Sequence, residues 1–155
     1  MDPLIRPCAT DDDFAAAIAV TKDYVRWLGM DLAFQGLDAE FAAFPVMYGP
    51  PEGVFLLAWE GPEPAGGVGL RRLEPGVCEM KRLFVYDRFQ GRGLGRGLCV
   101  GLIERARALG YGRMRLDTIA RMEPALALYA TLGFVKIAPY RFNPDPGAVY
   151  LELRL

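Results

Sequence analysis

The stretch that decides the fold reads EMKRLFVYDRFQGRGLGRGLCVGLIERARAL, from Glu79 to Leu109. It opens with EMKRLFV, which we interpret as a strand, and it closes with apolar residues at helical spacing, namely Leu94, Leu98, Leu102 and Leu109. A glycine-rich turn lies between them. The sequence therefore predicts a strand, a glycine loop and a helix, in this order.

The loop carries glycines at alternate positions, Gly91, Gly93, Gly95 and Gly97, with Arg92 and Arg96 between them. Glycine lets the backbone turn tightly and brings N–H groups close to a ligand. The following helix starts with unpaired N–H groups and the positive end of its dipole, so an anion is the expected ligand. The competing interpretation is a plain turn without a ligand, which does not require this many glycines.

The composition indicates one globular domain over residues 1–155, because 52% of the residues are hydrophobic and the length suffices to bury a core. The formal net charge of −1 argues against a general nucleic-acid-binding protein. The charge is uneven: residues 81–121 hold ten Lys and Arg against three acids, and the remainder holds eight against sixteen. A basic segment around a glycine loop favours a ligand with several phosphates.

Two absences narrow the chemistry, since the sequence contains no histidine and no serine. They exclude a Ser-His-Asp or Cys-His apparatus and histidine metal sites, and we expect no metal. The three widely spaced cysteines suggest neither a disulfide framework nor a zinc site. No signal-peptide pattern opens the sequence and no apolar run approaches membrane-spanning length, so we expect a cytoplasmic protein without a membrane partner.

The segments before the central stretch predict a strand and two helices. Leu4–Cys8 is a candidate edge strand, and Thr10 with Asp13 resembles a capping box that begins a helix. A second short helix is expected around Leu37–Phe44, ended by Pro45.

Three strands joined by short turns follow, which implies an antiparallel meander; they cover Val54–Glu60, Gly66–Leu73 and the run that begins at Cys78. After the central helix we expect a strand over Arg113–Thr118, a helix that starts at Pro124 and ends at Gly133, and two final strands in GFVKIA and AVYLELRL. The strand–helix–strand unit is a right-handed crossover, so its two strands should run parallel.

The third strand of the meander contains an irregularity. Cys78 and Met80 alternate on one face, whereas Leu83 and Val85 continue that apolar face shifted by one residue. A β-bulge near Lys81–Arg82 would absorb the extra residue, splay the strand and expose backbone groups to a ligand.

The order of the elements and two motifs resemble the GNAT family of N-acetyltransferases, in particular its small single-domain bacterial members. Gln90–Gly95, which reads QGRGLG, is similar to the family's pyrophosphate signature, and Ala125–Phe134, ALALYATLGF, is similar to a conserved helix of the family. The resemblance implies an α/β (α+β) fold with a mixed central sheet of about six or seven strands. It also implies an antiparallel N-terminal meander, splayed parallel central strands and about four helices.

The resemblance further implies acetyl-CoA as acyl donor and a primary amine as acceptor, with direct attack in a ternary complex. Carried over by position, the backbone of Leu83, Phe84 and Val85 pairs with the pantetheine arm. The pyrophosphate would be held by the loop, that is, by Gln90, Gly91, Arg92, Gly93, Leu94, Gly95 and Arg96. Many relatives have an asparagine where this sequence has Met122, and Thr118 is our candidate to replace its contact with the cofactor.

Two residues are candidates for proton transfer. Tyr129 matches the family position of the acid that protonates the leaving thiolate, and a core aromatic is the alternative interpretation. Glu79 is our candidate base, acting through water, whereas a surface glutamate or a salt-bridge partner of Lys81 is the alternative. We expect Lys81 and Arg82 to be solvated or close to phosphate rather than catalytic.

For the acceptor side we predict that Asp31, Phe34 and Asn143 bind substrate, although a helix connector and a loop cap are the plainer interpretations. Asp31, Glu40 and Glu79 would suit a cationic amine, which leaves small-molecule and peptide amines open. Tyr140 and Arg141 should face the same side. Edge strands at either end of the sheet could pair in a homodimer.

Two other classes compete with an acetyltransferase. A dinucleotide-binding oxidoreductase fails on spacing, because the last glycine of G-x-G-x-x-G falls on Arg96 or Leu98, and because there is only one parallel crossover. A catalytically silent acyl-CoA-binding regulatory module would keep Gln90–Gly95 but would need neither Glu79 nor Tyr129. Both are present, which favours an enzyme, although a fold does not determine a function.

Overall fold

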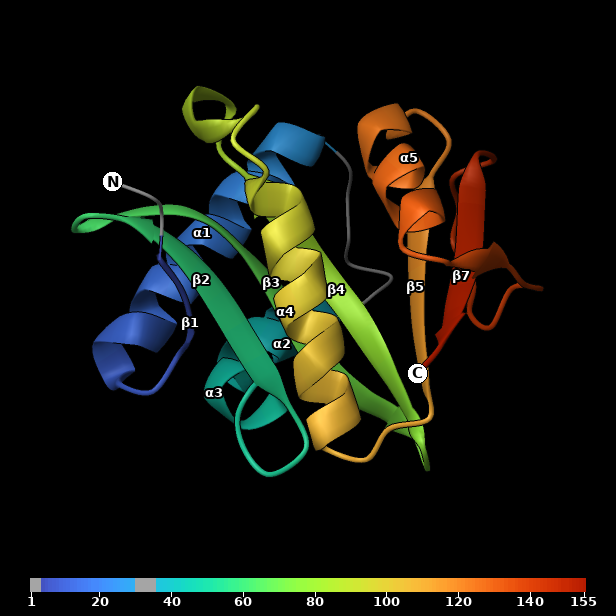
Figure 1. Ribbon diagram of the computed structural model, residues 1–155, viewed down its shortest axis with the longest axis horizontal. Coiled ribbons are helices and arrows are strands. Elements are labelled where there is room, and N and C mark those ends of the chain that lie inside the picture. Colours follow the sequence, from blue (N-terminus) through green and yellow to red (C-terminus); the bar gives the residue numbers. More distant parts are fainter. Residues whose placement is uncertain (1–3, 30–35) are drawn as a thin grey trace.

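The computed structural model describes residues 4–29 and 36–155. They form a mixed seven-stranded sheet in the order β1-β2-β3-β4-β5-β7-β6, with helices on both faces (Figure 1). The strands are β1 (Leu4–Pro7), β2 (Val54–Glu60), β3 (Glu63–Glu74), β4 (Val77–Val85), β5 (Arg113–Ile119), β6 (Val135–Lys136) and β7 (Ala148–Arg154). The α-helices are α1 (Asp11–Leu28), α2 (Leu37–Ala42), α3 (Phe44–Met47), α4 (Leu94–Ala108) and α5 (Glu123–Thr131), and Asp87–Phe89 forms a 3₁₀ turn. The predicted fold class is confirmed.

The N-terminal elements begin and end where the sequence signals lie. β1 is an edge strand paired with β2. The Oγ1 of Thr10 accepts a hydrogen bond from the Asp13 N–H at 3.1 Å, and the Asp13 carboxylate accepts from the Thr10 N–H at 3.2 Å. This capping box satisfies N–H groups that a helix start leaves unpaired. Gly29 ends α1 in the left-handed conformation.

The second predicted helix is divided in two. α2 ends at Ala42, and α3 begins at Phe44 with Pro45 in its first turn. Proline has no N–H group, and the first turn of a helix leaves its N–H groups unpaired in any case, so proline is tolerated there. The prediction that Pro45 ends a helix is therefore wrong, since it lies at the start of one. This division gives the described residues five α-helices rather than about four.

The sheet changes direction at β4. β1 to β4 pair antiparallel in sequence order, as the meander predicted. β4 then pairs parallel with β5 across the α4 crossover, but only from Val77 to Glu79. Figure 1 shows the two strands separating beyond these pairs. The splayed parallel strands are therefore present, and they leave one edge of the later part of β4 without a neighbouring strand among the described residues.

The predicted bulge lies on β4 where the strands separate. Gly67 of β3 pairs with Phe84 and Gly69 pairs with Lys81, so two residues of β4 lie opposite one of β3. Arg82 has a φ of 63°, a left-handed conformation that a side chain makes costly. The prediction made from the shifted apolar face is confirmed.

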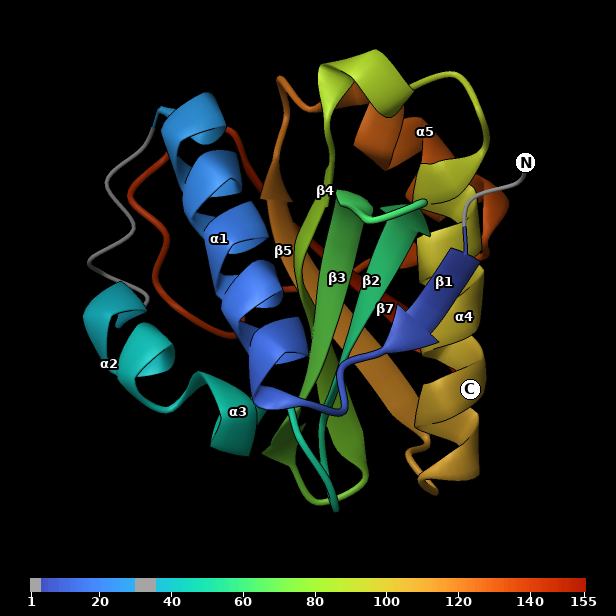
Figure 2. The same ribbon diagram turned by 90° about the vertical axis from the view of Figure 1, so that its left-hand side faces the viewer.

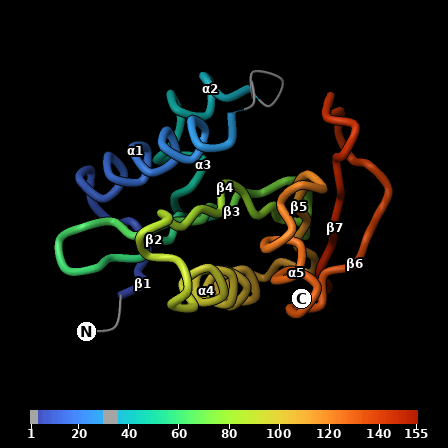
Figure 3. Tube along the Cα trace, turned by 90° about the horizontal axis from the view of Figure 1, so that it is seen from above, coloured from blue at the N-terminus to red at the C-terminus, as the bar shows by residue number. Residues whose placement is uncertain are grey.

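The helices form two layers around the sheet. α1, α2 and α3 lie on one face, and α4 and α5 lie on the other (Figure 3). α1 packs against β3 and β4 (Figure 2). α4 places Leu98 and Leu102, both fully buried, against the opposite face. Each such leucine contributes about 1.5–3 kcal/mol to stability, so the stripe predicted from helical spacing holds the glycine loop against the sheet. No helix among residues 4–29 and 36–155 has the length and apolar character needed to cross a membrane.

Candidate active site

A cavity of about 490 Å³ lies between the end of β4, the glycine loop and the start of α5. We call it the outer cavity, and it is lined by Leu83–Val85 of β4, by Gln90, Gly91 and Gly93–Gly95 of the loop, and by the first residues of α5, including Pro124 and Ala125. Its volume falls within the range of about 300–1,000 Å³ that is typical of ligand sites. The structure thus brings together the predicted strand and the predicted loop around one space.

The glycine loop is shaped for an anion at the start of α4. Gly91 and Gly93 have φ values of 81° and 77°, which residues with side chains rarely adopt. Gly93 is the N-cap of α4, and no side chain caps the helix start. The N–H groups of the first turn, from Leu94 onward, are therefore available to a ligand, and so is the positive end of the helix dipole.

The polar side chains of the loop point elsewhere. Gln90 donates hydrogen bonds to the Val85 carbonyl and to Asp87, both at 3.2 Å, and so ties the loop to the end of β4. Arg92 pairs with Glu60 at 2.7 Å, and neither Arg92 nor Arg96 is among the residues that line the outer cavity. Pyrophosphate contacts from these two arginine side chains stay a prediction.

The exposed edge of β4 supplies backbone groups to the same cavity. Phe84 and Val85 lie beyond the bulge and pair only with β3, and they line the outer cavity together with Leu83 of the bulge. A bound chain could therefore hydrogen-bond to them in the place of a neighbouring strand.

A second space, the inner cavity, lies next to the outer one. It is lined on one side by Lys81, Arg82 and Leu83, and on the other by Asp117, Thr118 and Asn143. Leu83, Met122 and Ala125 line both cavities. A ligand lying along the outer cavity would therefore end at the inner one.

Tyr129 projects from α5 into the lining of the inner cavity. Only 6% of the residue is exposed, and its ring packs against Phe134 with a centroid distance of 5.6 Å. Burial raises the pKa of Tyr129 well above its ordinary value, because the phenolate form would lose its hydration. The hydroxyl therefore stays protonated. The alternative interpretation of Tyr129 as a core aromatic is observed, and the residue also lines the cavity, whereas its role as the acid stays a prediction.

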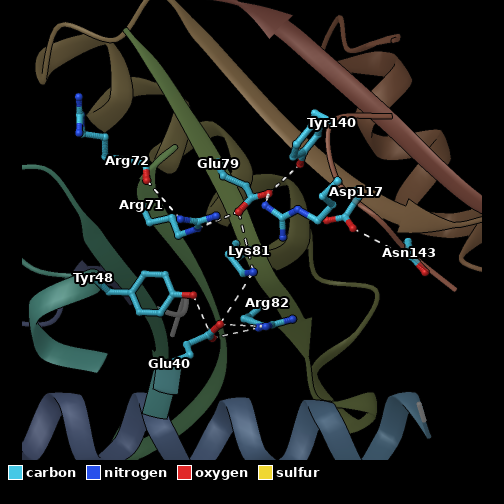
Figure 4. A network of polar contacts seen from close by, with 11 residues as sticks. Glu40, Tyr48, Arg71, Arg72, Glu79, Lys81, Arg82, Asp117, Tyr140 and Asn143 are labelled. Carbon is cyan, nitrogen blue, oxygen red and sulfur yellow. Dashed lines mark hydrogen bonds and ion pairs between the residues drawn. The ribbon is translucent and has the colours of Figure 1, made fainter. Parts of the chain in front are cut away.

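Glu79 lies at the centre of a buried ionic cluster (Figure 4). Its Oε1 accepts a hydrogen bond from Arg71 Nε at 2.8 Å, and its Oε2 accepts from the Tyr140 hydroxyl at 2.7 Å and from Arg141. Lys81 Nζ lies 3.8 Å from Oε1. None of the Glu79 side chain is exposed to solvent, and several donors share its carboxylate.

The cations around Glu79 affect its predicted role as a base. Burial acts to raise the pKa of Glu79, but the charges of Lys81, Arg141 and Arg71 outweigh it and hold the pKa below its usual range. Glu79 is also absent from the residues that line either cavity. Its role as a base stays a prediction, whereas the alternative of an ion pair with Lys81 is observed, in the interior rather than at the surface.

Lys81 and Arg82 are buried, which contradicts the expectation that they are solvated. Arg82 binds Glu40 through two nitrogens at 2.9 and 3.0 Å, and Lys81 Nζ lies 3.8 Å from the same carboxylate. Tyr48 donates a third hydrogen bond to Glu40 at 3.0 Å. The carboxylates of Glu40 and Glu79 therefore already face protein cations, and the suggestion that they attract a cationic substrate stays a prediction that these contacts do not favour.

The segment between β6 and β7 crosses to the inner cavity. Its Tyr140 and Arg141 bind Glu79, and its Asn143 lines the cavity. The Asn143 Oδ1 also accepts a hydrogen bond from the Asp145 N–H at 3.0 Å, so the alternative of a loop cap is observed, and its contact with substrate stays a prediction. Asp31 and Phe34, the other predicted substrate contacts, lie outside the described residues.

Several lining residues were missed by the sequence analysis. Trp27 and Arg121 line the outer cavity, and Tyr24 and Asp117 line the inner one. Asp117 ends an alternating strand and could have been noted as a polar residue beside Thr118. Trp27 and Tyr24 come from α1, and nothing in the sequence indicates which face of that helix meets β4.

Met122, in place of the family's asparagine, is the N-cap of α5 and provides no side-chain cap.

Comparison with known proteins agrees with the fold described above. Residues 16–134 match the model of the acetyltransferase (GNAT) family. An uncharacterized N-acetyltransferase of Schizosaccharomyces pombe is 38% identical over 148 residues, covering 93% of this chain and 88% of the relative.

Solved structures resemble the whole chain. An acetyltransferase from Streptococcus agalactiae superposes with a TM-score of 0.81 at 20% identity, over 100% of this chain and 99% of its own. A Bacillus subtilis acetyltransferase solved in complex with CoA gives a TM-score of 0.69 at 23% identity, over 99% of each chain. The family match and the yeast relative together establish that this chain belongs to the GNAT family of acetyltransferases.

Proposed function

We propose that this protein transfers an acetyl group from acetyl-CoA to a primary amine, by direct attack of the amine in a ternary complex. The observation that carries the proposal is that two adjoining cavities share lining residues, with the glycine loop in the lining of one and Tyr129 in the lining of the other. A long donor bound at the loop would present its reactive end to a protonated phenol.

The donor side fits CoA in charge and in shape. The start of α4 offers N–H groups to a pyrophosphate, and the free edge of β4 at Leu83–Val85 offers backbone groups to the amides of a pantetheine arm. A backbone N–H near Phe84 would stabilise the oxyanion that develops on the acetyl carbonyl. The CoA complex of the Bacillus subtilis acetyltransferase supports this choice of donor.

The chemical step requires a neutral amine and a protonated leaving group. An alkylammonium with a pKa of roughly 10.4 first loses a proton to solvent. The nitrogen then forms a bond to the carbonyl carbon and the carbon–sulfur bond breaks. In this scheme Tyr129 gives its proton to the departing thiolate, and the second proton that the nitrogen loses returns to the Tyr129 oxygen. The net products are the acetamide, CoA thiol and one proton.

The test measures CoA thiol released from acetyl-CoA in the presence of a panel of primary amines. The proposal predicts amine-dependent release in the wild-type protein, with the acetylated amine found by mass spectrometry. Acetyl-CoA binding without thiol release for any amine would contradict it and would favour the alternative of an acyl-CoA-binding regulatory module.

A further inference from the structure

We propose that Asp117 binds the ammonium group of the acceptor, so that the inner cavity is a docking site for a cationic primary amine. This inference rests on the proposed function, because it assigns the second substrate of the same reaction. The sequence suggested the carboxylates of Asp31, Glu40 and Glu79 as partners of a cationic amine. The structure instead places Asp117 in the lining of the inner cavity.

Asp117 is placed where an attacking amine must lie. It belongs to β5, on the opposite side of the inner cavity from Lys81 and Arg82, and it shares the cavity with Tyr129. Of the described residues that line this cavity, Asp117 is the one acid. A carboxylate that is the one acid among these described lining residues is the natural partner for an ammonium group.

The hydrogen bonds of Asp117 differ from those of the other buried acids. Glu40 and Glu79 each accept short bonds from an arginine and a tyrosine. Asp117 accepts one side-chain hydrogen bond within the described residues, from Asn143 Nδ2 at 3.4 Å, which is close to the upper limit for such a bond. Its carboxylate therefore keeps accepting capacity that the two glutamates have already used.

Asn143 fixes the direction in which Asp117 can act. The Asn143 Oδ1 accepts from the Asp145 N–H at 3.0 Å, which orients the amide so that its Nδ2 faces Asp117 (Figure 4). Asp145 in turn accepts from the Gly147 N–H at 2.7 Å. The charge of Asp117 also acts on Arg141, whose guanidinium is bonded to Glu79. These contacts hold the segment against β5, beside the inner cavity that Asp117 lines.

The side of the inner cavity opposite Asp117 would favour the loss of a proton from the bound amine. Lys81 and Arg82 line it, with Glu40 behind them. An ammonium held by Asp117 would face these like charges, which favour the neutral form of an amine, whereas Asp117 itself favours the charged form. The cavity would thus attract the cation at one wall and promote the loss of its proton at the other.

The test uses n-pentylamine and 1,5-diaminopentane as probes, titrated calorimetrically into the protein saturated with CoA. Asp117→Asn keeps the shape of the side chain and removes its charge. We expect it to weaken n-pentylamine binding by about 10- to 150-fold, the range that a hydrogen bond to a charged group contributes. Its affinity for acetyl-CoA should not change. Glu104→Gln, an exposed acid on α4, is the matched control and should leave both affinities unchanged.

A second variant tests the opposite direction. Asn143→Asp keeps the oxygen that accepts from Asp145 and adds a carboxylate beside Asp117, so it should strengthen n-pentylamine binding. It also keeps the inference testable if Asp117→Asn fails to bind acetyl-CoA because it does not fold.

The possible results separate this inference from the proposed function. Unchanged n-pentylamine affinity in Asp117→Asn, no n-pentylamine binding to the wild type, or an effect confined to 1,5-diaminopentane would each overturn the ammonium site. The last result would mean that Asp117 binds a remote cation rather than the reacting one. Charge-dependent amine binding without thiol release would support the ammonium site and contradict the transferase.

Discussion

Replacing Glu79 by glutamine tests whether the buried ionic cluster stabilises the fold. The wild-type carboxylate faces Arg71 at 2.8 Å, Lys81 at 3.8 Å and Arg141, and it accepts a hydrogen bond from Tyr140. Glutamine has nearly the same shape, but it removes the negative charge and turns an amide donor toward groups that are donors themselves.

The expected cost follows from burial. Removing one partner of a buried ion pair costs about 3–5 kcal/mol. The side chains of Arg71 and Arg141 keep exposed fractions of 25% and 18%, so water compensates part of the loss, and we expect about 3 kcal/mol. Urea unfolding followed by tryptophan fluorescence should show a midpoint lower by about 1.5 M if the slope is about 2 kcal/mol per M.

The pH dependence gives the result a second signature. The pKa of Glu79 in the folded protein lies below its unfolded value, so its stabilisation is complete above the unfolded value and is lost as the pH falls through the folded one. The difference between wild type and Glu79→Gln should therefore be largest near pH 7 and should shrink below about pH 4, the region of an ordinary glutamate pKa. A difference below 1 kcal/mol at pH 7, similar to that of the exposed Glu104→Gln, would refute this account of the cluster.

Two further substitutions examine the donor side and the acid. Tyr129→Phe should lower kcat by about 100-fold or more, the usual contribution of a general acid, and should leave acetyl-CoA affinity nearly intact in calorimetry; unchanged turnover would remove Tyr129 as the proton donor. Gly93→Glu should abolish acetyl-CoA binding, because it sets a negative charge beside the expected pyrophosphate. Gly93→Ala, which shares the strain of a φ of 77° but adds no charge, should bind more tightly than Gly93→Glu. Equal affinities of the two variants would show that charge at the loop is irrelevant. A β-carbon at Gly93 meets no atom within 4 Å, so strain and charge, rather than bulk at that carbon, carry the expected effect.

The local signals in the sequence predicted local structure well. The capping box at Thr10 and the bulge at Lys81–Arg82 depend on neighbouring residues, and both were found where they were expected. Pro45 was misjudged because proline is compatible with both the end of one helix and the start of the next, and the sequence alone does not distinguish the two.

The interior of the site depended on contacts between distant segments. The sequence suggested that Lys81 and Arg82 are exposed to solvent. In the structure, ion pairs with Glu40 from α2 and with Glu79 offset the cost of burying their charges. Tyr140 and Arg141 reach Glu79 from about 60 positions away in the sequence. Periodicity indicates which face of a strand is apolar, but it carries no information about which charged residues of other elements meet there.

The most direct test of the central claim is calorimetric titration of the protein with acetyl-CoA, with NAD as the comparison ligand. The adjoining cavities, the open start of α4 and the unpaired edge of β4 predict that acetyl-CoA binds at one site per chain and that NAD does not bind. Binding of NAD, or of neither ligand, would contradict the assignment of the glycine loop on which the proposed reaction depends.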